Sequence, residues 1–217
     1  MKKVIIIIVS LLVLVGAGIF YINMDNSKYL FEAYLDNNTL VIQKYSNKLS
    51  NKEWKVQKSE NTDEHIDLMP WSLDNRKDKI TKVVIKDKLE LSSIAFMFYG
   101  LNNLIEVEGL NNLSSSSLDN MAGLFYGCKS LKEIDLSSFN TSKVKSIAGM
   151  FAECENLKTI YVSNNWDVTN VEYSDNMFLN CEKLVGSNGT KYNEYIVDKT
   201  FAKVDDLDNV GYLSLKN

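Results

Sequence analysis

A repeat of 26 or 27 residues constrains this chain more than any other feature of its sequence. Four segments align at their starts, at positions 97, 124, 150 and 177: MFYGL, LFYGC, MFAEC and MFLNC. Other columns keep the same register, and one of them holds a leucine in every repeat, at positions 104, 131, 157 and 184. Because several independent columns share one period, the sequence predicts stacked units that bury their apolar side chains against their neighbours.

Each repeat reads as a helical segment followed by a strand. The apolar residues from 121 to 128 are spaced i, i+3, i+4 and i+7, which is typical of one helix face. Ile134 and Leu136 then alternate at a period of two, as in a strand with one buried face. We therefore expect an α/β fold, a short solenoid with a parallel β-sheet on one face and helical turns on the other.

The ends of such a stack need covers, and these divide the chain. The repeats are assigned to residues 80–185. Residues 28–79 contain predicted strands around the turn Asp36–Thr39 and form the expected β-rich N-terminal cap. Residues 186–217, where glycine and serine interrupt the repeat, form the expected C-terminal cap. Residues 1–27 remain as a membrane anchor or signal segment.

The N-terminal segment predicts a location. After two lysines, residues 4–22 carry no charge, and a helix of these 19 residues would span roughly 28 Å, close to the hydrocarbon thickness of a bilayer. The lysines favour a cytoplasmic N-terminus. We expect one N-terminal transmembrane helix, hence a single-pass protein of the cell membrane with its body outside. A cleaved signal after the small residues Val15–Ala17, giving a secreted or cell-surface protein, and a buried soluble helix are the alternatives.

Several motifs together resemble the BspA-type leucine-rich repeat surface proteins of bacteria. They are LFYGCKSLKEIDLSSFNTSKV from Leu124, MFAECENLKTI from Met150 and GSNGTKY from Gly186. The likeness covers roughly residues 33–215, with Leu101 in place of the first cysteine. The resemblance implies a surface-exposed, non-catalytic protein linked to adhesion or to binding of host proteins, and it supplies no catalytic residues.

The three cysteines follow the repeat. Cys128, Cys154 and Cys181 are 26 and 27 residues apart, and Leu101 occupies the same column in the first repeat. A column that accepts leucine is typical of a buried structural ladder, in which a free cysteine behaves as a small hydrophobic residue. A disulfide or a metal site is the alternative, since exported proteins can form disulfides.

The strand positions predict an acidic outer face. Val107, Ile134 and Ile160 should point inward, so the residues on either side of each should face solvent. Stacking by one repeat would place two pairs of carboxylates directly opposite each other, which is unfavourable. The simpler interpretation is repulsion that the face tolerates, and the functional hypothesis is a surface for a basic partner or a cation. Its candidate partner-binding residues are Glu106, Glu108, Glu133, Asp135 and Tyr161.

Composition excludes several functions. With 24 basic and 28 acidic residues the chain is weakly acidic, so we expect no nucleic-acid partner. The single histidine, His65, excludes a two-histidine metal site, and no nucleophile elbow or phosphate loop is present. Asp205, Asp206 and Asp208 lack the spacing of an EF-hand and read as a solvated loop, with calcium as the alternative. We expect no enzyme, no cofactor and no metal, although a hidden pair of carboxylates stays an open alternative.

These observations favour a non-catalytic recognition module, tethered to the membrane or secreted. It would bind an extracellular protein or surface ligand of unknown identity through its repeats. The alternative is a structural envelope protein with no dedicated ligand.

Overall fold

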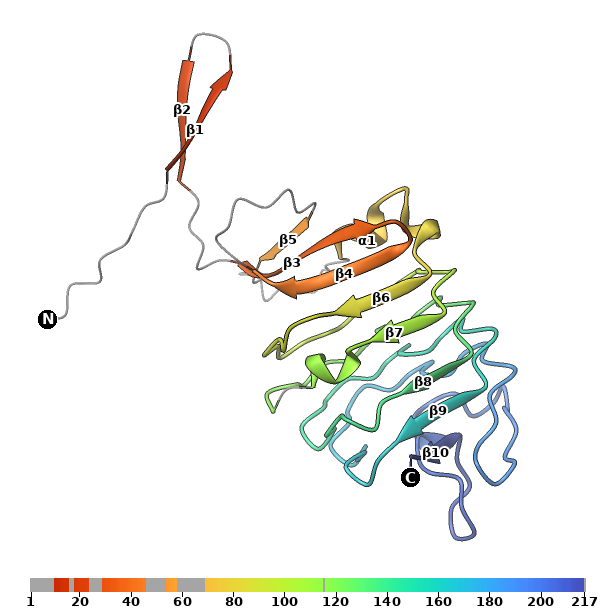
Figure 1. Cartoon of the computed structure of the whole chain (residues 1–217). Coiled ribbons are helices and arrows are strands. Elements are labelled where there is room, and N and C mark those ends of the chain that lie inside the picture. Colours follow the sequence, from red (N-terminus) through yellow and green to blue (C-terminus); the bar gives the residue numbers. More distant parts are fainter. Residues whose placement is uncertain are drawn as a thin grey trace, which may run out of the picture.

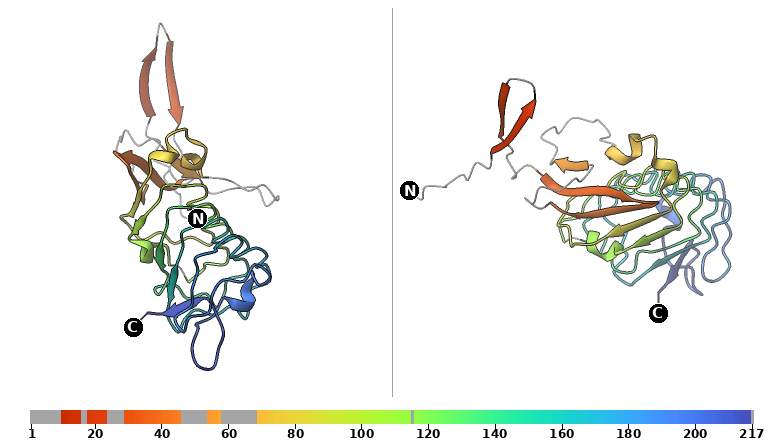
Figure 2. Two further views of the ribbon diagram at one scale, coloured as in Figure 1. Left: turned by 90° about the vertical axis from the view of Figure 1, so that its right-hand side faces the viewer. Right: turned by 45° about the horizontal axis from the view of Figure 1, so that its top comes forward.

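The computed structural model is a stack of turns whose short strands align along one side (Figure 1). It describes residues 10–15, 18–23, 29–45, 54–57, 69–114 and 116–216. The C-terminal residues lie at the end of the stack opposite to strands β3 and β4, as two further views also show (Figure 2).

The N-terminal half of the stack carries a five-stranded mixed sheet of order β5-β3-β4-β6-β7. Its strands are β3 (Tyr29–Asp36), β4 (Thr39–Lys44), β5 (Trp54–Gln57), β6 (Lys82–Ile85) and β7 (Glu106–Glu108). β3 pairs antiparallel with β4 across a tight turn, whereas β4–β6 and β6–β7 are parallel. The predicted cap and the first repeats therefore share one continuous sheet.

The C-terminal half carries a separate parallel sheet of order β10-β9-β8. Its strands are β8 (Glu133–Asp135), β9 (Thr159–Val162) and β10 (Leu213–Leu215). Strands β7 and β8 belong to different sheets. The single continuous parallel sheet that the repeat predicts is thus divided into two.

The predicted α/β leucine-rich-repeat solenoid is wrong, because the repeats form turns where helices were expected. Gly123 and Gly127 have φ angles of +58° and +73°, and Gly149 and Glu153 have +59° and +62°. A left-handed residue every four positions is incompatible with a right-handed helix. The N–H groups of Phe125 and other alternate residues accordingly bond to carbonyl groups of the next repeat instead of to their own turn.

Helices are few and short in the described part of the chain. None of them covers the predicted helical segments. They are one α-helix, α1 (Pro70–Leu73), and three 3-10 helices, η2 (Lys77–Lys79), η3 (Leu110–Leu113) and η4 (Lys199–Phe201).

The N-terminal segment also differs from the prediction. β1 (Ser10–Val15) and β2 (Gly18–Asn23) form an antiparallel hairpin in place of the transmembrane helix expected over residues 4–22. No described helix has both the length and the apolar character needed to cross a bilayer. The predicted single-pass membrane anchor, and the localisation inferred from it, are therefore contradicted.

The core is built from side chains that recur in register. Phe98, Phe125, Phe151 and Phe178 are fully buried, and their successive ring centroids lie 5.4, 5.8 and 6.0 Å apart. Tyr212 closes this aromatic column at its C-terminal end, 5.2 Å from Phe178. The leucines at positions 104, 131, 157 and 184 are also fully buried. Burial of these columns holds successive turns together and keeps the strands in place.

Candidate functional site

The outward side of the two sheets presents charged side chains on a buried support. Ile134 and Ile160 point into the core, whereas their neighbours along β8 and β9 are exposed or half-buried. We call this surface the outer strand face. It comprises Lys82, Glu106, Glu108, Glu133, Asp135, Tyr161 and Lys216.

On the first sheet, one lysine holds two glutamates. Lys82 lies opposite Glu106 in the parallel register of β6 and β7. Its Nζ is 3.0 Å from Glu106 Oε1 and 2.9 Å from Glu108 Oε2. Hydrogen bonds to Glu108 and Glu106 raise the pKa of the Lys82 ammonium above its ordinary value. Both glutamates remain well exposed, with 58% and 60% of their side-chain surface accessible.

On the second sheet, a lysine from the C-terminus is held by a carboxylate and an aromatic ring. Lys216 Nζ is 3.3 Å from Asp135 Oδ2 and 4.5 Å from the centroid of the Tyr161 ring. Partial burial tends to raise the pKa of Asp135, but hydrogen bonds from Ser137 and the nearby Lys216 outweigh it and lower that pKa. The ammonium thus receives both an ion pair and a cation–π contact.

Glu133 has no such partner. It is exposed at the centre of the face, opposite Thr159 in the register of β8 and β9. No hydrogen bond or ion pair joins its carboxylate to another described residue, whereas Glu106, Glu108 and Asp135 each pair with a lysine.

The predicted ladder of opposed carboxylates does not form across the two sheets. No strand pairing joins β7 to β8, so Glu106 and Glu133 are not partners in a ladder. The backbone reflects the same break: Lys158 N–H bonds to the Lys132 carbonyl at 2.8 Å, but no such bond joins Lys132 N–H to the carbonyl of Ile105, its counterpart one repeat earlier. Like charges placed directly opposite disfavour pairing at this position.

The cysteines line the core beside the phenylalanine column. Cys128, Cys154 and Cys181 are fully buried free thiols. Each Sγ donates a hydrogen bond to the carbonyl of a phenylalanine of the preceding repeat, at 3.2, 3.1 and 3.0 Å. Leu101 is also fully buried, in the corresponding position. Burial raises the pKa of Cys181 to about 12, so the thiols are poor nucleophiles.

The described aspartates that were considered as metal ligands do not come together in one site. Asp205 is buried and accepts hydrogen bonds from Asn188 N, Thr190 N and Thr190 Oγ1 at 2.8, 3.0 and 2.7 Å. Asp206 bonds instead to its own loop, through Asn209 N at 2.8 Å. His65 lies outside the described residues. Within the ranges that the structure describes, no three His, Cys, Asp or Glu residues are arranged to hold a metal.

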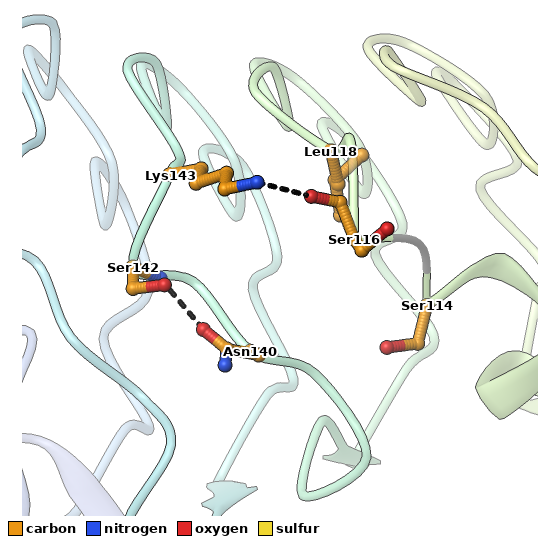
Figure 3. Close-up of a pocket in the computed structure, with 6 residues that line it drawn as sticks. All are labelled: Ser114, Ser116, Leu118, Asn140, Ser142 and Lys143. Carbon is orange, nitrogen blue, oxygen red and sulfur yellow. Dashed lines mark hydrogen bonds between the residues drawn. The ribbon is translucent and has the colours of Figure 1, made fainter.

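The structure also contains a surface cavity of about 390 Å³ that the sequence analysis missed (Figure 3). It lies between two successive repeats, beyond η3. The run of four serines at 114–117, which aligns with the sequence NTSK at 140–143 of the next repeat, is the sequence signal that could have indicated it. Its lining residues are Ser114, Ser116, Leu118, Asn140, Ser142 and Lys143.

Together, fold and face define a repeat protein of stacked turns that presents charged side chains from two short sheets. The chain belongs to the family described as "Mycoplasma protein of unknown function, DUF285", whose model matches residues 92–209, more than half of the chain. The match includes β7, β8 and β9 together with the cavity. No curated protein and no solved structure matches the chain. The likeness to BspA-type proteins therefore stays a prediction.

Proposed function

We propose that this protein is a non-catalytic protein-binding module whose outer strand face receives a lysine-bearing segment of a partner protein. One observation carries this proposal: the face already holds two of the chain's own ammonium groups, while Glu133 between them holds none.

The existing contacts indicate which chemistry the face recognises. Lys82 is held by two carboxylates, and Lys216 by a carboxylate together with the face of Tyr161. Carboxylates and aromatic rings are the groups that attract ammonium ions most strongly in proteins. A partner's lysine placed on Glu133 would complete the row of paired carboxylates.

The buried residues beneath the outer strand face favour a role in binding a partner. Ile134 and Ile160 anchor β8 and β9 in the core, so the outward side chains of these strands can vary without disturbing packing. Exposed ion pairs are individually weak and are screened by salt. Binding through this face should therefore be moderate in affinity and should weaken as the salt concentration rises.

The test uses the full-length protein and a synthetic peptide in which lysine and serine alternate over nine residues. Fluorescence anisotropy gives the dissociation constant at low and at physiological salt. Replacing Glu133 by glutamine should weaken binding about fivefold, and Glu133→Lys should abolish it, since one charged contact contributes roughly 1 kcal/mol. A peptide in which glutamate replaces lysine should not bind.

Glu155→Gln is the matched control. Glu155 is an exposed carboxylate that pairs with Lys129 at 2.6 Å, away from the outer strand face. An equal loss of affinity in this variant would mean that only net charge matters. That result, or the absence of binding by the wild-type protein, would favour the alternative of a structural protein with no dedicated ligand.

A further inference from the structure

The cavity between the first two full repeats is bordered on one side by a segment of small polar side chains. Ser114 and Ser116 occupy the positions that Asn140 and Ser142 fill one repeat later. In the next interface, the buried Thr141 joins the two repeats, since its hydroxyl donates to the Asp167 carbonyl at 2.8 Å and accepts from Asp167 N–H at 2.6 Å. Ser114 and Ser116 line the space that Figure 3 shows.

Hydrogen-bond donors surround this space. Lys143 reaches across it, and its Nζ donates one hydrogen bond to the Ser116 carbonyl at 3.1 Å (Figure 3). An ammonium group has three N–H donors, so two of them have no partner among the described residues. The Asn140 Oδ1 accepts from Ser142 N–H at 3.0 Å, which leaves the Asn140 amide nitrogen and the Ser142 hydroxyl without a partner in the described part of the chain.

The described side chains that line the cavity carry a positive charge and no negative charge. Lys143 is the charged residue among them, and none of the described residues that line the cavity is an aspartate or a glutamate, although the chain carries 28 acidic residues. A neutral sugar offers hydroxyl groups that need acceptors as well as donors. Here the Ser116 carbonyl and Asn140 Oδ1 already accept from Lys143 and Ser142, so the lining without a carboxylate chiefly offers donors and matches a tetrahedral oxyanion, which only accepts.

We propose that this cavity binds a phosphate or sulfate group carried by a small polar molecule. Lys143 supplies the positive charge, while Asn140, Ser142 and Ser116 supply neutral donors. The volume of about 390 Å³ lies within the roughly 300–1,000 Å³ typical of small-molecule sites, so the cavity has room for the rest of the molecule beside its oxyanion. This site is independent of the outer strand face, and neither proposal requires the other.

The experiment titrates the full-length protein with inorganic phosphate, sulfate, glycerol 3-phosphate and glycerol at constant ionic strength. Backbone amide shifts in NMR spectra report the position and the affinity of binding. We expect saturable shifts confined to residues 114–118 and 140–143, with glycerol 3-phosphate binding more tightly than inorganic phosphate. Lys143→Gln should weaken each oxyanion about tenfold, the loss expected for one charge-assisted hydrogen bond.

Two further variants make the test specific. Lys145 lies in the same segment, and its Nζ pairs with Glu172 Oε1 at 2.8 Å. The Lys145→Gln variant should bind the oxyanions as tightly as the wild type does. Ser142→Trp keeps Lys143 but fills the cavity, and it should abolish binding. Shifts that spread over all surface lysines, an equal effect of both lysine variants, or glycerol binding as tightly as glycerol 3-phosphate would each overturn the proposal.

Discussion

At the scale of the residue, the cysteine column and Asp205 show how buried polar groups find partners across neighbouring repeats or within the C-terminal segment. The cysteine thiols bond to phenylalanine carbonyl groups of the preceding repeat, and Asp205 accepts bonds from the loop around Thr190. Unpaired buried polar groups are costly, so these contacts stabilise one arrangement of the stack.

The thiols should be inert in the folded protein. Only a thiolate reacts with disulfide reagents, and burial raises the pKa of Cys181 to about 12. We expect a colourimetric thiol reagent to label none of the three cysteines at neutral pH and all three in denaturant. Ser116→Cys, at an exposed position, is the positive control and should react at once. Rapid labelling of native wild-type protein would contradict the burial of this column.

Asp205 should make stability depend on pH at its acidic end. Burial tends to raise the pKa of this carboxyl, but hydrogen bonds from Thr190, Asn188 and Gly211 outweigh it, and the pKa falls below the ordinary value of 3.8. Because the folded pKa is depressed, this stabilisation is present above pH 3.8 and is lost as the pH falls below it.

Asp205→Asn should therefore lower the free energy of unfolding by about 1–3 kcal/mol at neutral pH, as expected for hydrogen bonds to a buried charge. Denaturant titrations followed by circular dichroism should show that the difference from wild type shrinks below pH 3.8. A difference that stays constant with pH would mean that the charge of Asp205 is not what stabilises the cap.

At the scale of the element, the repeat shows why spacing alone could not separate a helix from a series of turns. Both place residues i, i+3, i+4 and i+7 on one buried side, so the phenylalanine column was predictable as core but not as a set of turns. The available signal was Gly123 with Gly127, two glycines inside one predicted helix of eight residues. Their positive φ angles end any helix before it can extend.

The two glycines also allow a matched test. A Cβ at Gly123 would lie 2.3 Å from the ring of Phe96, whereas a Cβ at Gly127 would meet nothing closer than 3.6 Å. Gly127→Ala should cost about 1–2 kcal/mol, the strain of a left-handed alanine. Gly123→Ala should cost roughly 1–3 kcal/mol more, because the Phe96 ring must move. Equal midpoints in urea unfolding would show that the ring yields without cost.

At the scale of the whole molecule, the sequence predicts which residues face outward but not which of them contact one another. Alternation along the strands placed Glu133 and Asp135 on the outside, because a strand with one buried residue exposes its neighbours. Lys216 was not predictable, since its contact with Asp135 joins residues 81 positions apart through the pairing of β10 with β9. The repeat period also does not predict that β7 and β8 belong to different sheets.

Lys216 should compete with a partner. If a lysine-bearing peptide uses the same carboxylate and ring, then Lys216→Gln frees Asp135 and Tyr161 and should tighten binding of the alternating peptide about threefold at low salt. Lys203→Gln removes an exposed lysine of the same cap and serves as the control. Weaker binding by Lys216→Gln in fluorescence anisotropy would mean that the C-terminal lysine supports the fold of the face.

Because β7 and β8 belong to different sheets, the strand side consists of two sheets, here called plates, which share one hydrophobic core. At this seam the strands are not paired, but the turns of the same two repeats are joined by backbone hydrogen bonds, such as Phe98 N–H to the Leu124 carbonyl at 3.0 Å, so bending should open or close the strand side alone. Distances within each plate would then stay constant, while the gap between Glu108 and Asp135 could widen or narrow. A partner that straddles the seam would respond to curvature, whereas one seated on a single plate would not.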